Sequence, residues 1–233
     1  MSSRLSVLLA AGSGRRMGFV KQFQKLGNRP VWKWSLETLF AAGVSRVAFI
    51  VPDDDVPLME EALRDDPNSD RVLVAAGGNT RGQSSQRGIL RLLADIAIEN
   101  WQSTYICVHD AARPFLTVHD TVRVFERAEV TGAAILAQRC KDTVKEEQNG
   151  VIVRTMPREA LWLAQTPQCA RADWFVDAYK KCDVDCVTDE AMLLEACGRK
   201  VELVEVQSFN GKLTVPEDWK YAEWLVTEKG QSE

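Results

Sequence analysis

The stretch Leu8-Leu9-Ala10-Ala11-Gly12-Ser13-Gly14-Arg15-Arg16-Met17-Gly18, with Lys21 shortly after it, sets the organisation that we expect for the whole chain. It is typical of a buried strand that runs into a glycine-rich, doubly basic turn. Glycine can adopt positive φ and lacks a Cβ atom, so the backbone of such a turn can wrap an anion and direct N–H groups at it. The basic side chains add the charge that a triphosphate needs. The stretch therefore predicts a phosphate-binding turn, while a plain connecting turn is the alternative.

Length and composition favour one large α/β domain that spans residues 1–233. Of the 233 residues 45% are hydrophobic, which is enough to bury one substantial core. The formal net charge of −4 excludes the basic field that nucleic-acid binding normally requires. No run of about 18 apolar residues and no signal-type N-terminal region occurs. We expect a cytoplasmic protein that binds a small anion and has neither a nucleic-acid nor a membrane partner.

Neither the cysteines nor the acidic run predicts a metal centre. The six cysteines contain no C-x-x-C pair, and in a cytosolic chain they are expected to be reduced and partly buried. Cys182 and Cys186 could face each other on one helix, but His109 and His119 lie far away in the sequence, which argues against zinc. The run at residues 53–55 could ligate a metal, yet successive residues point in different directions, so a solvated loop and helix cap are favoured.

Strand and helix patterns alternate along the first half of the chain. Continuous apolar runs predict strands at residues 4–10, 46–51, 71–75 and 105–110. Apolar residues at helical spacing predict helices at residues 31–42, 84–97 and about 117–131. In the first helix, Trp32, Leu36 and Leu39 are expected in the core, and Gly43 is expected to end it. Such alternation predicts a parallel sheet with right-handed crossovers.

The pattern changes after residue 136, where we expect a β-arm at about residues 138–156. Two β-prone pieces, residues 142–145 and 151–154, flank Gln148-Asn149-Gly150, which is a hairpin signal. A two-stranded arm cannot bury both of its faces, so a partner subunit is the expected cover and a homodimer the expected assembly. Helices at residues 172–181 and 189–197, a strand at 200–206 and a last helix from residue 216 are expected to follow.

Three features fall at the ends of expected strands: the glycine turn, the Gly77-Gly78 turn and Asp110. Parallel sheets bind ligands outside the carboxyl ends of their strands, so we expect the three to share one site. The carboxylate of Asp110 is expected to project into it, and one such carboxylate suffices for Mg²⁺ on a nucleotide. The alternative is that Asp110 caps a helix or pairs with Arg113.

Seven ordered groups of residues resemble the 2-C-methyl-D-erythritol 4-phosphate cytidylyltransferases of the non-mevalonate isoprenoid pathway, and together they cover nearly the whole chain. They are residues 10–17 with 21–23, 77–81 with 84, 108–114, 141–145, 161–162 with 165–168, 188–191, and 210–212. Seven matches in order are far more specific than any one of them. The resemblance implies a nucleotide-diphosphate-sugar transferase type of α/β fold, with a mostly parallel central sheet flanked by helices and a protruding β-arm through which dimers form.

The resemblance also implies the reaction. A phosphate oxygen of 2-C-methyl-D-erythritol 4-phosphate attacks the α-phosphorus of CTP without a covalent enzyme intermediate, and pyrophosphate leaves. Chemistry of this kind needs mainly in-line positioning and charge stabilisation. By resemblance, Arg16 and Lys21 stabilise charge on the phosphates and on the leaving pyrophosphate. The implied nucleotide-binding residues are Ala10, Ala11, Gly12, Gly14, Gly78, Ser84, Asp110 and Ala111; Gly78 and Ser84 lie against the cytosine, and Asp110 bears on the ribose and Mg²⁺.

The acceptor side is implied in the same way. Arg158 and Lys212 match the residues that hold the attacking phosphate, although without the resemblance both would be read as solvated surface cations. The residues that line the polyol site are Arg113, Thr143, Thr166 and Thr188. Thr143 and Arg158 flank the expected arm, which leaves open whether they serve their own site or that of the neighbouring subunit.

One departure from the family lies between Met17 and Lys21, which enclose only Gly18-Phe19-Val20, where many members have a longer segment with a proline just before the lysine. The shorter segment bears on where Lys21 lies and removes no charged group. Three other functions stay open. They are a cytidylyltransferase for ribitol phosphate or another pentitol phosphate, a nucleotide-binding dimer without catalysis, and a sugar-1-phosphate nucleotidylyltransferase with another base.

Overall fold

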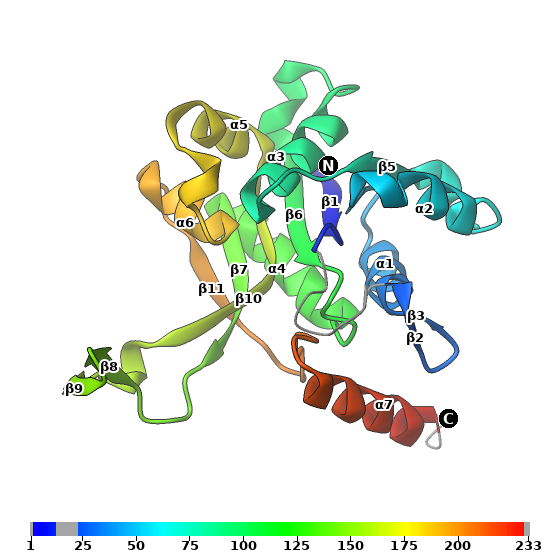
Figure 1. Cartoon of the computed structure of the whole chain (residues 1–233). Helices are drawn as coiled ribbons and strands as arrows, with labels where there is room; N and C mark the ends of the chain where they lie inside the picture. Colours follow the sequence, from blue (N-terminus) through cyan, green and yellow to red (C-terminus); the bar gives the residue numbers. More distant parts are fainter. Residues whose placement is uncertain (1, 13–22, 231–233) are drawn as a thin grey trace.

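The computed structural model describes residues 2–12 and 23–230, with side chains to residue 228, as a seven-stranded sheet between layers of helices (Figure 1). The strand order is β11-β7-β10-β6-β1-β4-β5. The strands are β1 (Ser3–Leu9), β4 (Arg46–Val51), β5 (Val72–Ala76), β6 (Thr104–Asp110), β7 (Ala133–Arg139), β10 (Trp162–Arg171) and β11 (Glu202–Glu205). Each neighbouring pair is parallel except that β10 runs antiparallel to both β6 and β7. The expected mostly parallel sheet is confirmed.

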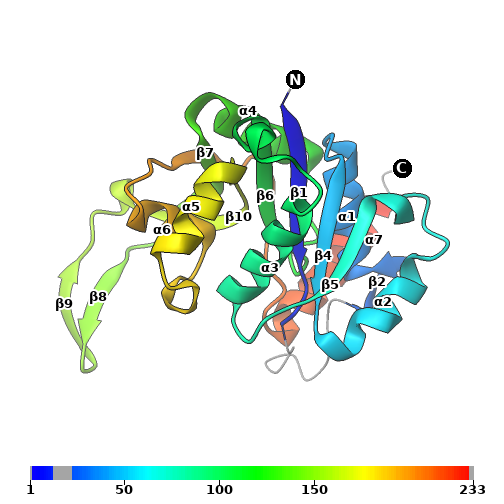
Figure 2. The ribbon, with the colours of Figure 1, turned by 90° about the horizontal axis from the view of Figure 1, so that it is seen from above.

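Two hydrophobic cores lie on opposite faces of the sheet, because successive residues of a strand point to opposite sides. Leu8 of β1 belongs to one core and Val7 to the other. The helices of the first core are α1 (Val31–Ala41), α2 (Val56–Leu63) and α4 (Val118–Thr131); those of the second are α3 (Arg81–Leu93), α5 (Ala172–Lys181) and α6 (Glu190–Ala196) (Figure 2). The strands are therefore covered on both faces, as their continuous apolar sequences predict.

Local sequence explains where several helices begin and end. Helix α1 ends just before Gly43, which has a φ of +87°, and its Trp32 is buried as predicted. Leu36 and Leu39 are also buried. Helix α4 begins after Thr117, whose hydroxyl oxygen accepts a hydrogen bond from the N–H of Asp120 and so caps the helix close to its predicted start.

Helix α3 begins three residues earlier than predicted, because Thr80 caps it by accepting from the N–H of Gln83.

The prediction of a helix cap at residues 53–55 was wrong in one respect. These residues form a turn of 3₁₀ helix, η2 (Asp53–Asp55), before α2, and no side chain of theirs caps that helix. In the described part of the chain, no group of three His, Cys, Asp or Glu side chains is placed to hold a metal ion.

Strand β10 is the largest element that the sequence analysis missed. Its sequence contains Pro167, and proline normally argues against a central strand because it donates no ladder hydrogen bond. The structure accommodates this residue at an irregularity of the β7–β10 pairing between Ala164 and Gln168, with a cis peptide bond between Thr166 and Pro167. As β10 is antiparallel, it begins beside the end of β7, where Trp162 pairs with Arg139.

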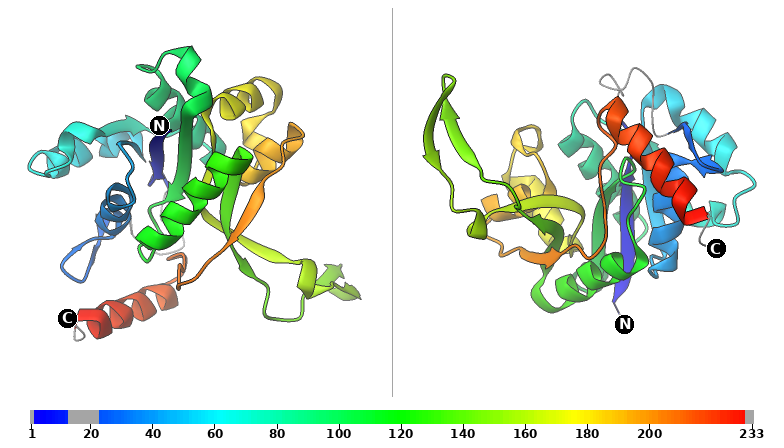
Figure 3. Two further views of the ribbon diagram at one scale, coloured as in Figure 1. Left: turned by 180° about the vertical axis from the view of Figure 1, so that it is seen from behind. Right: turned by 90° about the horizontal axis from the view of Figure 1, so that it is seen from below.

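The segment between β7 and β10 contains the expected hairpin, formed by β8 (Lys145–Gln148) and β9 (Val151–Thr155). Its two-residue turn is Asn149-Gly150, and both residues have positive φ, as such turns require. The first strand begins at Lys145 rather than at residue 142 as predicted. The hairpin extends away from the sheet (Figure 3), and it leaves Ile152 61% exposed.

The chain ends in helix α7 (Pro216–Gly230), which begins at a proline as predicted. A small two-stranded sheet of β2 (Lys25–Leu26) and β3 (Arg29–Pro30) lies near it, and Leu26, Val31, Phe115, Leu213 and Ala222 form a third, smaller core there. Of the helices in the described residues, none is long and apolar enough to cross a membrane.

Candidate active site

The loops after β1, β4, β5 and β6 lie next to one another at the carboxyl ends of these parallel strands. The N–H of Ala10 donates to the carbonyl of Ile50 at 2.7 Å, and the N–H of Ala111 donates to the carbonyl of Leu9 at 2.9 Å. The N–H of Gly77 donates to the carbonyl of Val51 at 2.8 Å. These bonds continue the strand pairing past the strand ends, so the structure brings together the beginning of the glycine turn, the Gly77-Gly78 turn and the end of β6.

Close approach explains the glycines of the second turn. A Cβ atom at Gly77 would lie 2.5 Å from the Cβ of Ala11, and one at Gly78 would lie 2.4 Å from the Cβ of Gln83. The N–H of Gly78 donates to the hydroxyl of Ser84 at 3.0 Å, and that hydroxyl donates to the carbonyl of Thr80 at 2.9 Å. The turn after β5 is therefore fixed against both the turn after β1 and the start of α3. Gly14, Arg16 and Lys21 lie outside the described residues, as does the shortened segment between Met17 and Lys21.

Asp110, the last residue of β6, is 7% exposed, and its carboxylate lies between two cations. Its Oδ2 lies 2.6 Å from Nζ of Lys212, and its Oδ1 lies 3.3 Å from Nε of Arg81. Burial alone raises the pKa of this carboxyl, but the charges of Arg81 and Lys212 outweigh that effect and hold the pKa well below its ordinary value. Asp110 is therefore ionised. The alternative that it caps a helix or pairs with Arg113 was wrong, because Arg81 and Lys212 are its partners.

Arg81 also forms a bidentate ion pair with Glu190, the first residue of α6, with both N–O distances at 2.9 Å. Glu190 is 3% exposed. Burial lowers the pKa of Arg81, but the two carboxylates more than compensate and raise it above its ordinary value. The guanidinium thus links α3, β6 and α6 at the site. Both residues lie within the family motifs, but neither was predicted from the sequence to have a role.

A second chain of hydrogen bonds lies behind Asp110. The backbone N–H of Asp110 donates to Oγ1 of Thr166 at 3.1 Å. That hydroxyl lies 3.0 Å from Nδ1 of His109, whose Nε2 lies 3.2 Å from the carbonyl oxygen of Arg113. A carbonyl oxygen only accepts, so Nε2 carries the proton and the hydroxyl of Thr166 donates to Nδ1. Burial lowers the pKa of His109 to about 4, which keeps the ring neutral.

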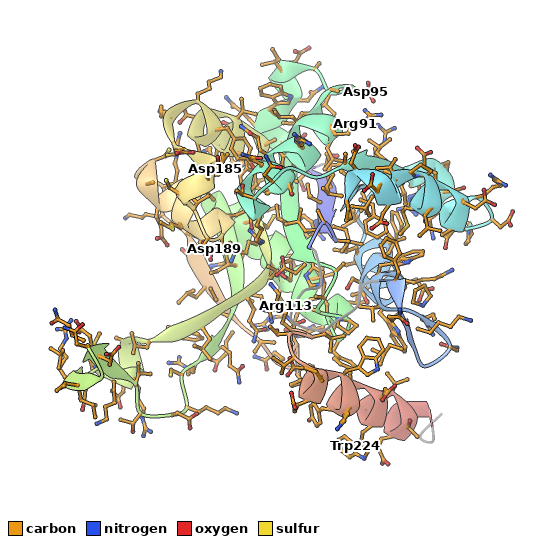
Figure 4. The ribbon with its side chains drawn as sticks, in the orientation of Figure 1. Arg91, Asp95, Arg113, Asp185, Asp189 and Trp224 are labelled. Atoms are coloured by element: carbon orange, nitrogen blue, oxygen red, sulfur yellow. The ribbon has the colours of Figure 1, made fainter. Side chains whose placement is uncertain are left out.

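Residues 210–212 approach the site from the far end of the chain. The side-chain amide of Asn210 donates to Oε1 of Gln165 and to the carbonyl of Thr166, both at 3.0 Å. Arg113 donates to the carbonyl of Asn210 at 2.8 Å, and Figure 4 shows Arg113 at the end of the sheet that faces α7. These bonds place Lys212 beside Asp110. Lys212, Arg113 and Thr166, which the sequence analysis assigned to the acceptor side, therefore lie around one carboxylate.

The other acceptor-side residues lie elsewhere in the chain. Arg158 begins a short 3₁₀ helix, η5 (Arg158–Ala160), and its side chain donates to the carbonyl of Lys141 at 3.1 Å. Thr143 is exposed in the segment that leads to β8. Thr188 is also exposed, just before α6, and its hydroxyl contacts the sulfur of Met192 at 3.7 Å. Within the described residues, no hydrogen bond or ion pair joins these three side chains to Asp110.

We expect Thr166→Val to lower the free energy of unfolding by about 1–3 kcal/mol. Valine has nearly the shape of threonine, but it leaves the buried N–H of Asp110 without its acceptor and Nδ1 of His109 without its donor. Urea denaturation followed by circular dichroism measures the change. Thr143→Val is the matched control, because Thr143 is exposed and its replacement is expected to change stability by less than about 0.5 kcal/mol. Equal effects in the two variants would contradict the hydrogen-bond chain.

Comparison with known proteins adds independent evidence. The model of one family, 2-C-methyl-D-erythritol 4-phosphate cytidylyltransferase, matches residues 5–228. The chain is similar to the protein of that name from Halalkalibacterium halodurans, at 34% identity over 228 residues that cover 96% of each chain. It is 35% identical to the protein of the same name from Geobacter metallireducens, with 96% of this chain and 97% of that one covered. A crystal structure of 4-diphosphocytidyl-2C-methyl-D-erythritol synthase superposes with a TM-score of 0.81 at 29% identity, covering 97% of this chain and 99% of that one.

Proposed function

The chain belongs to the 2-C-methyl-D-erythritol 4-phosphate cytidylyltransferase family, and from that premise we propose how its residues divide the work of the reaction. The enzyme transfers CMP from CTP to 2-C-methyl-D-erythritol 4-phosphate and releases pyrophosphate, a step of isoprenoid precursor synthesis. The observation that carries the assignment of roles is the ionised Asp110 carboxylate, held between Lys212 and Arg81 where the loops after β1, β5 and β6 meet.

The nucleotide is proposed to lie along the loops after β1 and β5. The backbone of Ala10, Ala11 and Gly12, continued by Gly14, would cradle the triphosphate, and Arg16 and Lys21 would stabilise the charge that develops on it. Gly78 would lie against the cytosine, as the family resemblance implies, while the absence of a Cβ atom there makes room for Gln83 of the same chain. Ser84 would act by holding the N–H of Gly78, and Asp110 with Ala111 would bear on the ribose.

The acceptor is proposed to bind on the Lys212 side of Asp110. Its phosphate carries negative charge towards another anion, so the attack requires cations that screen the repulsion and hold the phosphate oxygen in line with the α-phosphorus. Lys212, which lies beside Asp110, is proposed for this role, and Arg158 is proposed to complete it. The nearby Arg113 and Thr166, together with Thr143 and Thr188, are proposed to line the polyol site.

A magnesium ion is proposed to accompany CTP, as the family resemblance implies. The donor set fits a metal that is held mainly by phosphate oxygens, because Asp110 is ionised and Mg²⁺ on a nucleotide commonly takes only one or two protein carboxylates. When bound, the ion would supply positive charge that polarises the phosphates, and Asp110 would hold it while Lys212 binds the acceptor.

The proposed function is tested by pyrophosphate release. Each of the four nucleoside triphosphates is combined with 2-C-methyl-D-erythritol 4-phosphate, ribitol 5-phosphate or a sugar 1-phosphate, with Mg²⁺ and with a chelator. We expect release with CTP and the methylerythritol phosphate only, and its loss when the chelator removes the metal. A higher kcat/KM with ribitol 5-phosphate would establish the pentitol alternative. Nucleotide binding without release for any acceptor would establish the inactive homologue.

The hairpin β8–β9 is proposed to be the arm of a homodimer. Three consecutive apolar residues, Val151, Ile152 and Val153, are exposed on it, and a partner subunit would cover them. Arg158 and Thr143 lie at the base of the arm and outside the Asp110 cluster of their own chain. We therefore propose that they complete the site of the neighbouring subunit.

Mixing two inactive variants tests this arrangement. Arg158→Ala and Lys212→Ala are each expected to abolish most activity alone, yet a refolded equimolar mixture should recover about a quarter of wild-type activity. Random pairing of a symmetric dimer gives about half mixed dimers, each with one site that keeps both residues if Arg158 acts across the interface.

Activity of the mixture no greater than that of the separate variants, with mixed dimers present by native mass spectrometry, would place Arg158 in the site of its own chain. A mixture of Arg158→Ala and Thr143→Val, both at the base of the arm, is the matched control. The two changes then fall on the same side of the interface, so each site of a mixed dimer retains one defect and no recovery is expected.

A further inference from the structure

Two cysteines lie against each other where α5 and α6 end. Cys182 follows the last residue of α5 and Cys197 follows the last residue of α6, and their sulfur atoms are 3.2 Å apart. The possibility that Cys182 and Cys186 face each other on one helix is not realised, because α5 ends at Lys181 and Cys186 lies in a separate 3₁₀ turn, η6 (Val184–Cys186). Both cysteines are free thiols in the structure.

Backbone bonds hold the two thiols in place. The N–H of Cys182 donates to the carbonyl of Ala178, and the N–H of Cys197 donates to that of Leu194. Both side chains pack on the core that contains Phe175. The sulfur atoms need to approach by only about 1 Å to reach bonding distance, so a disulfide requires little rearrangement of the helices.

The other thiols are placed less favourably for oxidation to a disulfide. Cys107 and Cys169 are buried, and burial raises the pKa of Cys107 to about 12, which leaves almost no reactive thiolate. Burial and the Cys182 thiol also raise the pKa of Cys197, so the pairing of Cys182 with Cys197 rests on the close approach of their sulfur atoms. Cys140 contacts the carbonyl of Asp142, and the exposed Cys186 contacts the carboxylate of Asp183. In the described part of the chain, Cys182 and Cys197 form the one recorded contact between two sulfur atoms.

We propose that Cys182 and Cys197 form a reversible disulfide when the protein meets hydrogen peroxide. One thiolate attacks the peroxide to give a sulfenic acid and hydroxide, and the second sulfur displaces the sulfenic oxygen as water. In sum, two thiols and one hydrogen peroxide give one disulfide and two waters. A dithiol reductant restores both thiols and becomes a disulfide itself.

The disulfide would close a ring that contains the α5–α6 connection, and this connection packs against the start of α3, next to the Gly77-Gly78 turn. Within it, the carboxylate of Asp185 accepts from the hydroxyl of Thr80 at 2.8 Å and from the amide of Gln83 at 2.9 Å. Asp185 and Asp189 both lie on this side of the molecule (Figure 4). A Cβ atom at Gly82 would lie 2.0 Å from the carbonyl oxygen of Val184, so the connection touches α3 directly. Oxidation would therefore restrict the motion of the α5–α6 connection, which contacts the start of α3 beside the Gly77-Gly78 turn.

Thiol mapping of the reduced, full-length chain tests the proposal. After treatment with hydrogen peroxide and alkylation, we expect the free thiols to fall from six to four, with Cys182 and Cys197 cross-linked in an unreduced peptide digest, and dithiothreitol to restore six. The midpoint of thermal unfolding of the cross-linked chain should rise by about 5–10 °C, because a disulfide that closes a loop of about 15 residues restricts the unfolded chain.

The matched control is Cys186→Ser, which should leave the cross-link intact, whereas Cys197→Ser should abolish it and the rise in the midpoint. A disulfide that contains Cys186, or separate alkylation of Cys182 and Cys197 after peroxide, would overturn the proposal. An unchanged or lower midpoint of thermal unfolding in the cross-linked chain would contradict the proposed stabilisation of the α5–α6 connection. Thiol mapping of the wild-type chain does not depend on the folding of any variant. It measures the state of the thiols and not turnover, so its result is independent of the proposed substrate roles.

Discussion

Asp110→Asn is expected to lower kcat/KM for cytidylyl transfer by about 10³-fold or more. The substitution keeps the size of the side chain but removes a negative charge that two cations share. Lys212, 2.6 Å from the carboxylate, would lose the anion that positions its ammonium group for the acceptor phosphate. A bound metal would lose its one proposed protein carboxylate at the same time. Steady-state rates over a range of CTP, acceptor and Mg²⁺ concentrations measure the loss.

A matched control is Asp120→Asn. Asp120 is also a buried aspartate that pairs with an arginine, Arg123, but it lies at the start of α4 and belongs to no part of the site. Its replacement is expected to lower stability and to leave kcat/KM of the folded enzyme within about threefold of wild type. If Asp110→Asn also stayed within tenfold of wild type, the proposed role of this carboxylate would be wrong.

Arg81→Met is expected to lower the free energy of unfolding by about 3–5 kcal/mol. The change leaves Glu190, which is 3% exposed, as a buried charge without its bidentate partner, and it removes one of the two cations beside Asp110. Methionine keeps most of the aliphatic contact of the arginine stem, so the loss reports mainly on the charge. Urea titration of the purified variant measures it.

The matched control for this arginine is Arg127→Met. Arg127 pairs with Glu202 on the surface, where the two side chains are 50% and 38% exposed, and such pairs contribute about 0–1 kcal/mol. The double variant Arg81→Met/Glu190→Met should recover part of the loss, because it removes the uncompensated charge as well. Equal losses from Arg81→Met and Arg127→Met would show that the buried pair does not link the helices as described.

Most of the sheet could be predicted from sequence because its strands are covered on both faces and are therefore continuously apolar, as in residues 46–51. Strand β10 could not, since Pro167 and three polar residues, Gln165, Thr166 and Gln168, interrupt the apolar pattern. These polar side chains are buried and satisfied by hydrogen bonds that only the folded chain supplies, such as the bond from Asn210 to Gln165.

The partners of Asp110 illustrate the same limit. Arg113, three residues away, was the alternative partner considered from sequence, whereas the partners in the structure are 29 and 102 residues away in the chain. The end of a strand can be recognised locally, so the carboxylate was correctly placed at the edge of the sheet. Which cations reach it depends on where α3 and residues 210–212 pack, and that is decided by tertiary structure.

In the dimer proposed above, the reversed direction of β10 would couple assembly to substrate binding. The arm leaves β7 at Arg139 and returns into β10 at Trp162, next to each other and at the same edge of the sheet as Asp110. A partner subunit that binds the arm would therefore contact the segment that leads directly into β10. In this strand, Thr166 accepts a hydrogen bond from the backbone N–H of Asp110. For a dimer built this way, linkage is reciprocal: if pairing of subunits tightens the binding of the alcohol phosphate, the alcohol phosphate must lower the dissociation constant of the dimer by the same factor. The apparent affinity of the enzyme for the alcohol phosphate would then depend on the protein concentration, because that concentration sets the fraction of dimer.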